Sequence, residues 1–432
     1  MNVKPLILET NEKNFEKKFL NRIRINSSTN VKVQKFVDRT IADIKNKGDS
    51  SLVSYVNKYD GYKIKNVKDI LVTTKQINEA YTYIEKSQLL SLKKSILRIR
   101  KFAKQQKSFS WSFNEGGATL GEKITPIDSA GIYVPAGKAS YPSTVLMNAI
   151  PAKVAGVKNI IMACPISTIE DHALAIVAAD LCNVDKIYRM GGAHAIAALA
   201  YGTKKISSVD KIVGPGNIYV TLAKKSVFGD VGIDNIAGPS EVVIIADATN
   251  DPDWIAMDLF SQAEHDELAQ PILISTSSKV LKNVQASIEK LLPSMLRKEI
   301  ILKSFNNRGI FIKARSNKEI SEVVNNIAPE HLEIMSKDYK LLLKSINNAG
   351  AIFLGEYSPE VFGDYCAGPN HVLPTSGSAR FSSPLGVEDF QKKSSIINIS
   401  RKTAMNLSKT AVSMALSEGL QAHALSAKYR GK

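Results

Sequence analysis

The feature that most constrains the fold is an alternation of short apolar runs with helical segments between Gly131 and Asp247. Runs such as Ile160–Ala163 and Val242–Ile245 have the length of strands. Each is separated from the next by a loop containing Gly or Pro and by an Ala-rich helical segment. The alternation predicts βαβ units and a parallel sheet.

The same rhythm continues beyond Asp247 and predicts a second α/β unit. We expect a helix over Trp254–Ala263, a strand over Pro271–Ile274 and a further helix over Val280–Leu292. At 432 residues the chain is long enough for two to three domains. The fold class that follows is α/β, with two parallel-sheet domains.

The two ends of the chain have a helical pattern. Up to about Gln106 the pattern is mainly helical, with a helix expected over Gln76–Arg100 after the capping residue Thr74. The segment Thr403–Lys428 is also expected to be helical. Between them, Tyr357–Pro384 is rich in Gly, Pro and Ser, and a loop of that length is usually functional or disordered.

The net charge of +16 would suit a nucleic-acid partner or an anionic cofactor. The densest basic stretch, Lys93–Lys107, interleaves with Leu92, Ile96, Ile99 and Ala103 at helical spacing, which is typical of the solvated face of an amphipathic helix. Nothing in the sequence resembles a zinc finger, an RNA-reading strand or a helix-turn-helix. We therefore expect no nucleic-acid partner.

Several features bear on the compartment. The sequence has no uninterrupted apolar run of about 18 residues, so we expect no membrane span. Residues 1–15 do not resemble a signal peptide. Cys164, Cys182 and Cys366 are odd in number and unrelated in spacing, which fits neither a disulfide framework nor a metal site. We expect buried thiols and a cytoplasmic protein.

The six histidines mostly stand beside other groups that bind metals or protons. Gln262 and His265 are three apart on an expected helix and so face one direction, which suits two ligands of one metal. Asp364 lies shortly before His371, and His423 follows a glutamine and an alanine. Imidazole nitrogen with carboxylate and amide oxygen suits Zn²⁺.

Two further histidine contexts leave alternatives open. Glu330 and His331 are the best candidates for an acid/base pair, although glutamate after Pro329 would also suit the first turn of a helix. Glu418 and His423 would lie about 140° apart on a regular helix, so both reach one site only if Gly419 loosens the helix. His172 lies in a helical context without a cluster of such groups around it, and we expect it on the surface.

Glycine turns suggest a second ligand. The segment Gly214–Asn217 follows an expected strand and precedes an expected helix, which is how backbone N–H groups are brought against a phosphate. A tight turn alone would also explain these glycines. Gly191-Gly192 has a similar position, so the two turns could converge on one ligand, and Tyr133 could offer an aromatic wall to a nucleotide ring.

With these motifs assembled, the chain resembles the histidinol dehydrogenase family from about residue 20 to 428. Six segments in order carry the resemblance: Gly131–Gly137, Val213–Asn217, Ala237–Glu241, Ser261–His265, Ala328–His331 and Asn370–Thr375. The resemblance implies a zinc-dependent homodimer, with one Zn²⁺ per subunit, that oxidises L-histidinol to L-histidine through an aldehyde and reduces two NAD⁺.

The resemblance also assigns roles. The zinc ligands would be Gln262, His265, Asp364 and His423, with His423 crossing from the partner subunit. His331 would take the hydroxyl proton as hydride leaves, and Glu330 would activate the water that attacks the aldehyde. Substrate contacts would come from these ligands and His331, together with Ser240 and Glu418.

Tyr133, Asn217 and His194 would contact NAD. The last position departs from the family pattern, which has glutamine where this chain has His194. Imidazole lacks the paired donor and acceptor of an amide, so we expect NAD affinity or cofactor choice to differ.

The resemblance further implies a domain division with two Rossmann-like domains. We expect an N-terminal extension (1–25), a discontinuous metal and substrate domain (26–132 and 240–385), a cofactor domain (133–239) and a C-terminal helical extension (386–432) that reaches the partner's site. The rival readings are a relative acting on another small polar alcohol and a zinc hydrolase, in which Glu330 would activate metal-bound water.

Overall fold

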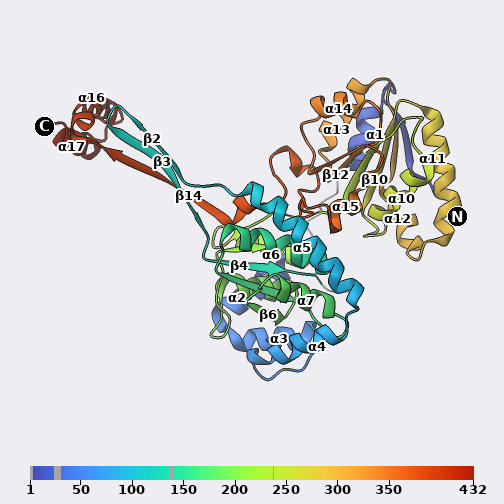
Figure 1. The fold of residues 1–432 in the computed structure, drawn as a ribbon, viewed down its shortest axis with the longest axis horizontal. Coiled ribbons are helices and arrows are strands. Elements are labelled where there is room, and N and C mark those ends of the chain that lie inside the picture. The colour runs from blue at the N-terminus through green and yellow to red at the C-terminus, as the bar shows by residue number, and fades with distance from the viewer. Residues whose placement is uncertain (1–2, 24–30, 136–140, 237) are drawn as a thin grey trace.

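The computed structural model describes residues 3–23, 31–135, 141–236 and 238–432. It consists of two α/β lobes and an arm that projects away from both (Figure 1). The expected α/β class with two parallel sheets is confirmed. Within the described residues, none of the helices has the length and apolar character needed to cross a bilayer.

The first lobe is built on a six-stranded parallel sheet of order β1-β11-β10-β9-β12-β13. Its strands are β1 (Leu6–Glu9), β9 (Glu241–Ile245), β10 (Gln270–Ser275), β11 (Ile310–Lys313), β12 (His331–Ile334) and β13 (Ala351–Leu354). Alternate residues of β9 enter different cores: Val242 and Ile244 pack with Phe260 and Phe305 on one face, and Val243 packs on the other. Both faces of the sheet are therefore covered by helices.

The helices of this lobe are α1 (Phe15–Ile23), α10 (Pro252–Ala263), α11 (Ser278–Leu291), α12 (Lys298–Arg308), α13 (Asn317–Ile327), α14 (Tyr339–Ser345) and α15 (Glu360–Tyr365). Short 3₁₀ turns lie at Leu292–Ser294 and Ser378–Arg380. The predicted elements around Trp254, Pro271 and Val280 correspond to α10, β10 and α11, so those predictions are confirmed. The segment from Tyr357 to Pro384 contains only α15 and one 3₁₀ turn and is otherwise irregular.

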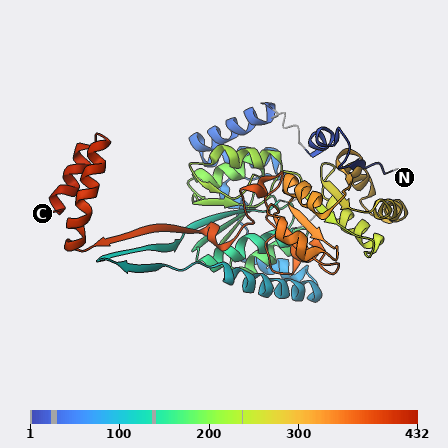
Figure 2. The ribbon, with the colours of Figure 1, turned by 90° about the horizontal axis from the view of Figure 1, so that it is seen from above.

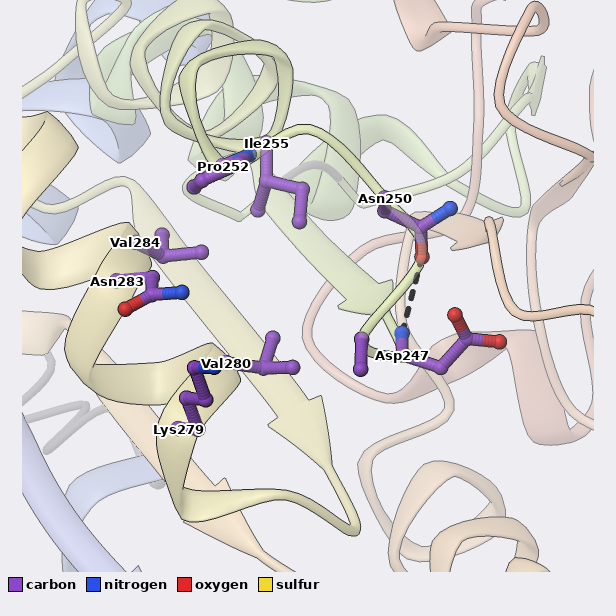
Figure 3. Close-up of a pocket in the computed structure, with 9 residues that line it drawn as sticks. Asp247, Asn250, Pro252, Ile255, Lys279, Val280, Asn283 and Val284 are labelled. Atoms are coloured by element: carbon purple, nitrogen blue, oxygen red, sulfur yellow. Dashed lines mark hydrogen bonds between the residues drawn. The ribbon is translucent and has the colours of Figure 1, made fainter.

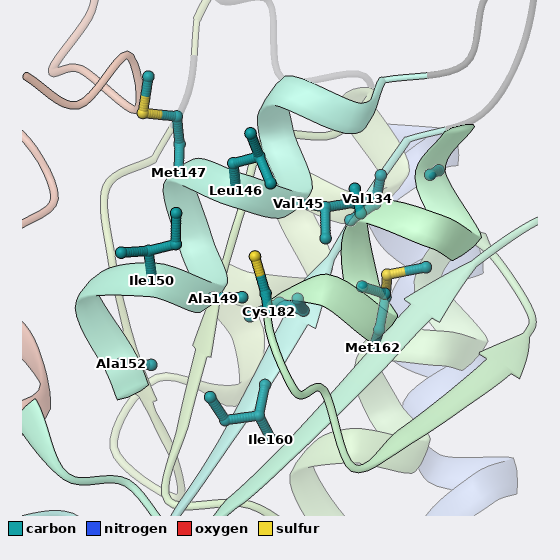
Figure 4. Close-up of a cluster of buried hydrophobic side chains, with 14 of the residues drawn as sticks. Val134, Val145, Leu146, Met147, Ala149, Ile150, Ala152, Ile160, Met162 and Cys182 are labelled. Carbon is teal, nitrogen blue, oxygen red and sulfur yellow. The ribbon is translucent and has the colours of Figure 1, made fainter. Parts of the chain in front are cut away.

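The second lobe has a five-stranded parallel sheet of order β6-β5-β4-β7-β8. Its strands are β4 (Ser129–Tyr133), β5 (Asn159–Cys164), β6 (Lys186–Arg189), β7 (Lys211–Val213) and β8 (Gly232–Ile233). Helices α6 (Pro142–Ala155) and α7 (Ala173–Leu181) cover one face, and α8 (Gly192–Tyr201) and α9 (Ile218–Val227) the other. Figure 4 shows Ile160 and Met162 of β5 in the same buried cluster as Leu146 and Ile150 of α6.

The N-terminal helices pack differently from the expected domain division. Residues 26–132 were expected to join the metal domain, but α2 (Val31–Lys47) and α3 (Asp49–Tyr59) pack with α8, and α5 (Lys86–Gln106) packs with α6 and α7. The apolar faces of these helices pack on the five-stranded lobe. The order of the segments along the chain does not predict on which lobe they pack. Residues 1–25 are also more than an extension, because β1 completes the other sheet.

Several local expectations change as well. The helix expected over Gln76–Arg100 is two helices, α4 (Thr74–Thr82) and α5, and the cap is Thr73, whose hydroxyl accepts from the N–H of Gln76. A 3₁₀ turn at Val67–Ile70 precedes them. The predicted amphipathic face of α5 is confirmed, since Leu92, Ile96, Ile99 and Ala103 are its buried residues. Cys164 and Cys182 are buried as expected, but Cys366 is exposed.

The C-terminal segment forms the arm together with a hairpin from the middle of the chain. Strand β14 (Gln391–Ile399) pairs antiparallel with β3 (Ala118–Pro126), which pairs with β2 (Trp111–Glu115). The expectation of a purely helical extension was therefore wrong for its first part, although α16 (Arg401–Ser417) and α17 (Gln421–Arg430) follow. Figure 2 shows these two helices at the far end of the extended strands. A 3₁₀ turn at Val387–Phe390 directly precedes β14.

The turn between β7 and α9 brings two backbones unusually close. Gly214 has φ +110°, and a Cβ there would lie 2.1 Å from the carbonyl oxygen of Tyr133. A buried ion pair between Lys224 and Asp234 fixes the turn: Lys224 Nζ donates to the Gly214 oxygen at 2.9 Å, and the Gly214 N–H donates to Asp234 at 2.7 Å. The sequence prediction of a strand, a glycine turn and a helix is confirmed here.

Replacing Gly214 with alanine should lower the thermal unfolding midpoint more than the same change at Gly229. Gly229 has a similar φ of +108°, but an added Cβ would meet no atom of the described residues within 4 Å. Both alanines carry backbone strain of about 1–2 kcal/mol, and the clash at Gly214 adds about 1–3 kcal/mol. Differential scanning calorimetry of both variants measures this, and equal midpoints would contradict the close approach.

Candidate active site

The candidate site lies at the amino edge of the six-stranded sheet. Glu330 immediately precedes β12, Ser240 immediately precedes β9, and α10 ends beside them because it runs antiparallel to the strands. Ligands of open α/β sheets usually bind at the carboxyl edge. In this lobe, a pocket at the carboxyl edge has a volume of only about 130 Å³ (Figure 3). One oxygen of its Asp247 already accepts from the N–H of Lys337, and the other accepts from the N–H of Thr249.

The backbone of Glu241 holds both candidate acid/base residues. Its N–H donates to Glu330 Oε2 at 3.0 Å, and its carbonyl oxygen lies 3.2 Å from His331 Nδ1. A carbonyl only accepts, so we assign the proton of this contact to Nδ1. His331 Nε2 is buried without a hydrogen-bond partner among the described residues and faces Asp364 Oδ1 at 3.7 Å. The free nitrogen therefore points toward the candidate metal ligands. The alternative of a helical first turn at Glu330 was wrong, because a strand begins there.

Buried carboxyl groups surround His331. Burial raises the pKa of Glu330 to about 7 and that of Glu360 to about 8. Glu360 Oε2 lies 3.7 Å from His331 Nδ1. Burial alone would lower the pKa of His331, but the charges of Glu360 and Glu330 outweigh it and hold that pKa well above its usual value. Glu330 can therefore exchange a proton near neutral pH, and the nearby carboxylates stabilise a proton on His331.

Further buried groups extend this cluster on the side of α10. Glu333, on β12, accepts from the N–H of Glu360 at 2.6 Å, and burial raises its pKa well above the usual value. Burial also raises the pKa of Asp258 to about 6. Ser261 donates to Glu360 Oε1 at 2.9 Å, which ties α10 to α15.

Asp364 lies between the acid/base pair and another histidine. His371 Nδ1 donates to the carbonyl oxygen of Asp364 at 3.0 Å and lies 3.9 Å from its carboxylate. Burial alone would raise the pKa of Asp364, but His331 and His371 hold it below its usual value. Asp364 is therefore an ionised carboxylate, as a metal ligand should be.

Gln262 and His265 are neighbours, as the spacing predicted, although α10 ends at Ala263 and His265 lies in the following turn. Gln262 Nε2 is 3.5 Å from His265 Nδ1. Gln262 Oε1 is buried and has no hydrogen-bond partner among the described residues. An orphaned buried acceptor beside an imidazole fits the coordination of a metal ion. In the described part of the chain, no three His, Cys, Asp or Glu side chains lie close enough together to hold a metal ion. Among the four predicted zinc ligands, only His265 and Asp364 are of these residue types and lie in this lobe.

The remaining predicted ligand lies on the arm. His423 is an exposed residue in the first turn of α17, and Glu418 is exposed at the end of α16. Gly419, with φ +74°, separates the two helices, so the predicted interruption is confirmed. Both views show the arm directed away from the lobes (Figures 1 and 2), so one chain does not bring these residues to Glu330 and His331.

The predicted cofactor residues gather at the carboxyl edge of the other sheet. Chain order reverses at β4, with β5 on one side and β7 on the other, and such switch points bind ligands in open α/β sheets. Tyr133 ends β4, and its hydroxyl accepts from the N–H of Gly192 at 3.1 Å. Asn217 caps α9 by accepting from the N–H of Tyr219 at 3.1 Å and is exposed.

His194 does not lie on the open side of this edge. His194 is only 3% exposed, and its Nε2 atom lies 2.8 Å from Asp60 Oδ2. The motif residues Gly137 and Ala237 fall outside the described residues. His172, expected on the surface, is instead buried and contacts the carbonyl oxygen of Thr168 at 3.3 Å, because it begins a helix that packs into the core.

Sequence reasoning missed several residues of the site. Glu360 precedes Asp364 by one helical turn, and Glu333 follows His331 by two on the strand, so both could have been found by face periodicity. Glu241 ends the motif segment Ala237–Glu241, but the sequence alone does not indicate a role for it. Asp60 has no local signal, because its partner is 134 positions away.

These features define a class: a two-lobed α/β enzyme with a candidate acid/base pair and candidate metal ligands on one sheet and a reversal of strand order, typical of ligand sites, on the other. The family model described as histidinol dehydrogenase matches residues 23–431. The chain belongs to the histidinol dehydrogenase family, whose members are oxidoreductases.

Individual relatives agree across nearly the whole length. A histidinol dehydrogenase of Pseudomonas fluorescens is 54% identical over 391 residues, which cover 90% of this chain and 88% of that protein. One of Methylococcus capsulatus is 51% identical over 424 residues, covering 98% and 97%. The crystal structure of histidinol dehydrogenase from Elizabethkingia anophelis superposes with a TM-score of 0.94 at 33% identity, covering 100% and 98% of the two chains.

Raising the pH should destabilise the metal-free protein, and Glu360→Gln should weaken that dependence. The pKa of Glu360 is raised from 4.5 to about 8 on folding, so the folded state holds a proton that the unfolded state has lost. Stability that is present below about pH 4.5 is then lost as the pH rises through about 8. His331 contributes with the same sign.

Thermal midpoints between about pH 5.5 and 8.5 measure this slope. Glu322→Gln, which changes an exposed glutamate, is the control and should keep the wild-type slope. A Glu360→Gln slope as steep as that of the wild type would contradict the buried carboxyl group.

Proposed function

We propose that this protein oxidises L-histidinol to L-histidine through L-histidinal, with two NAD⁺ as oxidants and one Zn²⁺ per subunit. The observation that carries the proposal is the anchoring of Glu330 and His331 by the Glu241 backbone, with His331 Nε2 facing Asp364. Family membership supports the substrate. A biosynthetic dehydrogenase of this kind would work in the cytoplasm.

Gln262, His265 and Asp364 would hold the zinc together with His423 of the partner subunit. The orphaned Gln262 Oε1 and the ionised Asp364 carboxylate support this set. When bound, the metal would orient the imidazole and amino nitrogens of the substrate. Ser240 and Glu418 would add substrate contacts, and Tyr133 and Asn217 would contact the cofactor.

The acid/base pair would act in sequence. In the first oxidation, His331 Nε2 accepts the hydroxyl proton while the carbon-bound hydrogen leaves as hydride to NAD⁺, which gives the aldehyde. In the second, Glu330 takes a proton from the water that attacks the aldehyde carbon, and the resulting hydrate transfers its hydride to a second NAD⁺. The pKa of about 7 lets Glu330 accept a proton near neutral pH. The charges that raise the pKa of His331 stabilise the imidazolium that forms when it takes the hydroxyl proton.

The arm supports a dimer with shared sites. Large apolar side chains are exposed along it: Trp111, Phe113, Ile397, Leu407, Met414, Leu416 and Tyr429. In α16 and α17 the buried residues are only Ser408, Ala415 and Ala424. A thin sheet and helix pair with so little core needs a partner surface. A second copy would provide that surface and receive His423 and Glu418 of its partner.

Glu330→Gln should slow aldehyde oxidation about 100-fold or more, with a much smaller effect on the first hydride transfer. Glutamine keeps the size of the side chain but accepts no proton from water. Stopped-flow NADH formation from L-histidinol and from L-histidinal separates the two steps. The exposed Glu322→Gln is the control and should behave as the wild type. An equal loss in both steps would contradict the assigned role.

Shared sites can be tested with heterodimers. His265→Asn and His423→Asn homodimers should each lack bound zinc and turnover, because every site loses one ligand. A purified heterodimer of the two should regain about half of the wild-type activity, since one of its two sites contains both native histidines.

The control is a heterodimer of His265→Asn with Glu330→Gln. Both changes lie in the lobe, so each of its sites is defective, and the rate of L-histidine formation should stay far below half of the wild-type rate. If the heterodimer of His265→Asn and His423→Asn is also inactive and free of zinc, the result contradicts a site that is shared between two subunits.

A further inference from the structure

His194 and Asp60 form a buried pair beneath the turn that begins α8. Their side chains are 4% and 6% exposed, and His194 Nε2 lies 2.8 Å from Asp60 Oδ2. Asp60 follows α3, so the contact joins α3 to the first turn of α8. The imidazole ring stacks on Tyr55 at 5.8 Å and lies 6.5 Å from Tyr59, both on α3. The pair therefore belongs to the core between two helices.

The same carboxylate also holds the turn itself. Asp60 Oδ2 accepts from the N–H of Gly191 at 3.3 Å. The turn is tightly enclosed, since a Cβ at Gly191 would lie 2.9 Å from Pro165 and 3.2 Å from Asp60 Oδ1. The next residue, Gly192, has φ +58° and donates its N–H to the Tyr133 hydroxyl. One chain of contacts thus connects His194 through Asp60 and the turn to Tyr133.

This chain of contacts ends at the switch point, where the proposed NAD⁺ site lies. Tyr133 ends β4, and its carbonyl oxygen packs against Gly214 of the second glycine turn. Truncating His194 would leave the buried Asp60 carboxylate without its side-chain donor, and an uncompensated buried charge is costly. The carboxylate would then move or admit water, and the turn that it holds would move with it.

We propose that His194 and Asp60 are a positioning pair that orients the Gly191-Gly192 turn and Tyr133 for NAD⁺, so that His194 controls cofactor affinity without touching the cofactor. The proposal rests on the proposed function, because it takes NAD⁺ as the cofactor. The amide nitrogen of a glutamine at this position would also be a donor and could make the same bond to Asp60. The position therefore requires a side-chain donor that reaches Asp60, and that donor need not be an imidazole.

The test is calorimetric titration of the zinc-loaded dimer with NAD⁺. His194→Ala should bind NAD⁺ about tenfold more weakly, whereas His194→Gln should stay within about threefold of the wild type. His172→Ala is the matched control, because His172 is a buried histidine of the same lobe, and it should leave NAD⁺ affinity unchanged. Zinc content and histidinol affinity should be unchanged in all three variants, and steady-state kinetics should show a raised KM for NAD⁺ in His194→Ala with kcat retained.

A double-mutant cycle tests the pairing. Asp60→Ala should weaken NAD⁺ binding as His194→Ala does, and the double variant should be no weaker than either single variant. Fully additive losses would overturn the pair. If Asp60→Ala does not fold, the comparison of His194→Ala with His194→Gln still decides the question.

Two outcomes would overturn the proposal while leaving the proposed function intact. One is wild-type NAD⁺ affinity in His194→Ala. The other is a loss in His194→Gln as large as in His194→Ala, which would show that the donor is not what matters. A wild-type protein that binds no NAD⁺ would overturn both the proposal and the proposed function.

Discussion

The site depends on one short stretch of backbone, the N–H and carbonyl of Glu241 at the start of β9. The N–H fixes Glu330 and the carbonyl fixes His331. Both contacts come from the main chain at a strand end, so they are held by the register of β9 with β12, in which His331 lies opposite Val242. The sheet thus positions the candidate acid/base pair more rigidly than loops could.

Burial then gives the pair its chemistry. Burial raises the pKa of Glu330 to about 7 and that of Glu360 to about 8, and the charge that these groups carry once ionised stabilises a proton on His331. The cost of burying so many carboxyl groups is offset by hydrogen bonds from Ser261 and from backbone N–H groups. The proposed metal completes this arrangement on the side of Gln262 and Asp364.

Much of this could be predicted from the sequence, where the signal is local. Apolar runs separated by glycine turns predicted the strands, and the spacing of Gln262 and His265 predicted that they lie together. The rest depends on contacts between distant segments. Helices α2 to α5 pack on the other lobe because their apolar stripes fit there, β14 forms a strand because β3 offers a free edge, and His194 is buried because Asp60 lies next to it. No local pattern encodes these choices, and composition could not show that the arm carries His423 away from its own lobe.

The most direct measurement is the amount of NADH formed per L-histidinol consumed by the purified protein, with and without a zinc chelator. The account predicts two NADH per histidinol, lost on chelation and restored by Zn²⁺. One NADH per histidinol, with the aldehyde released, would contradict a single site that performs both oxidations. No NADH from folded, zinc-loaded protein would contradict the substrate and point to a family member that acts on another alcohol.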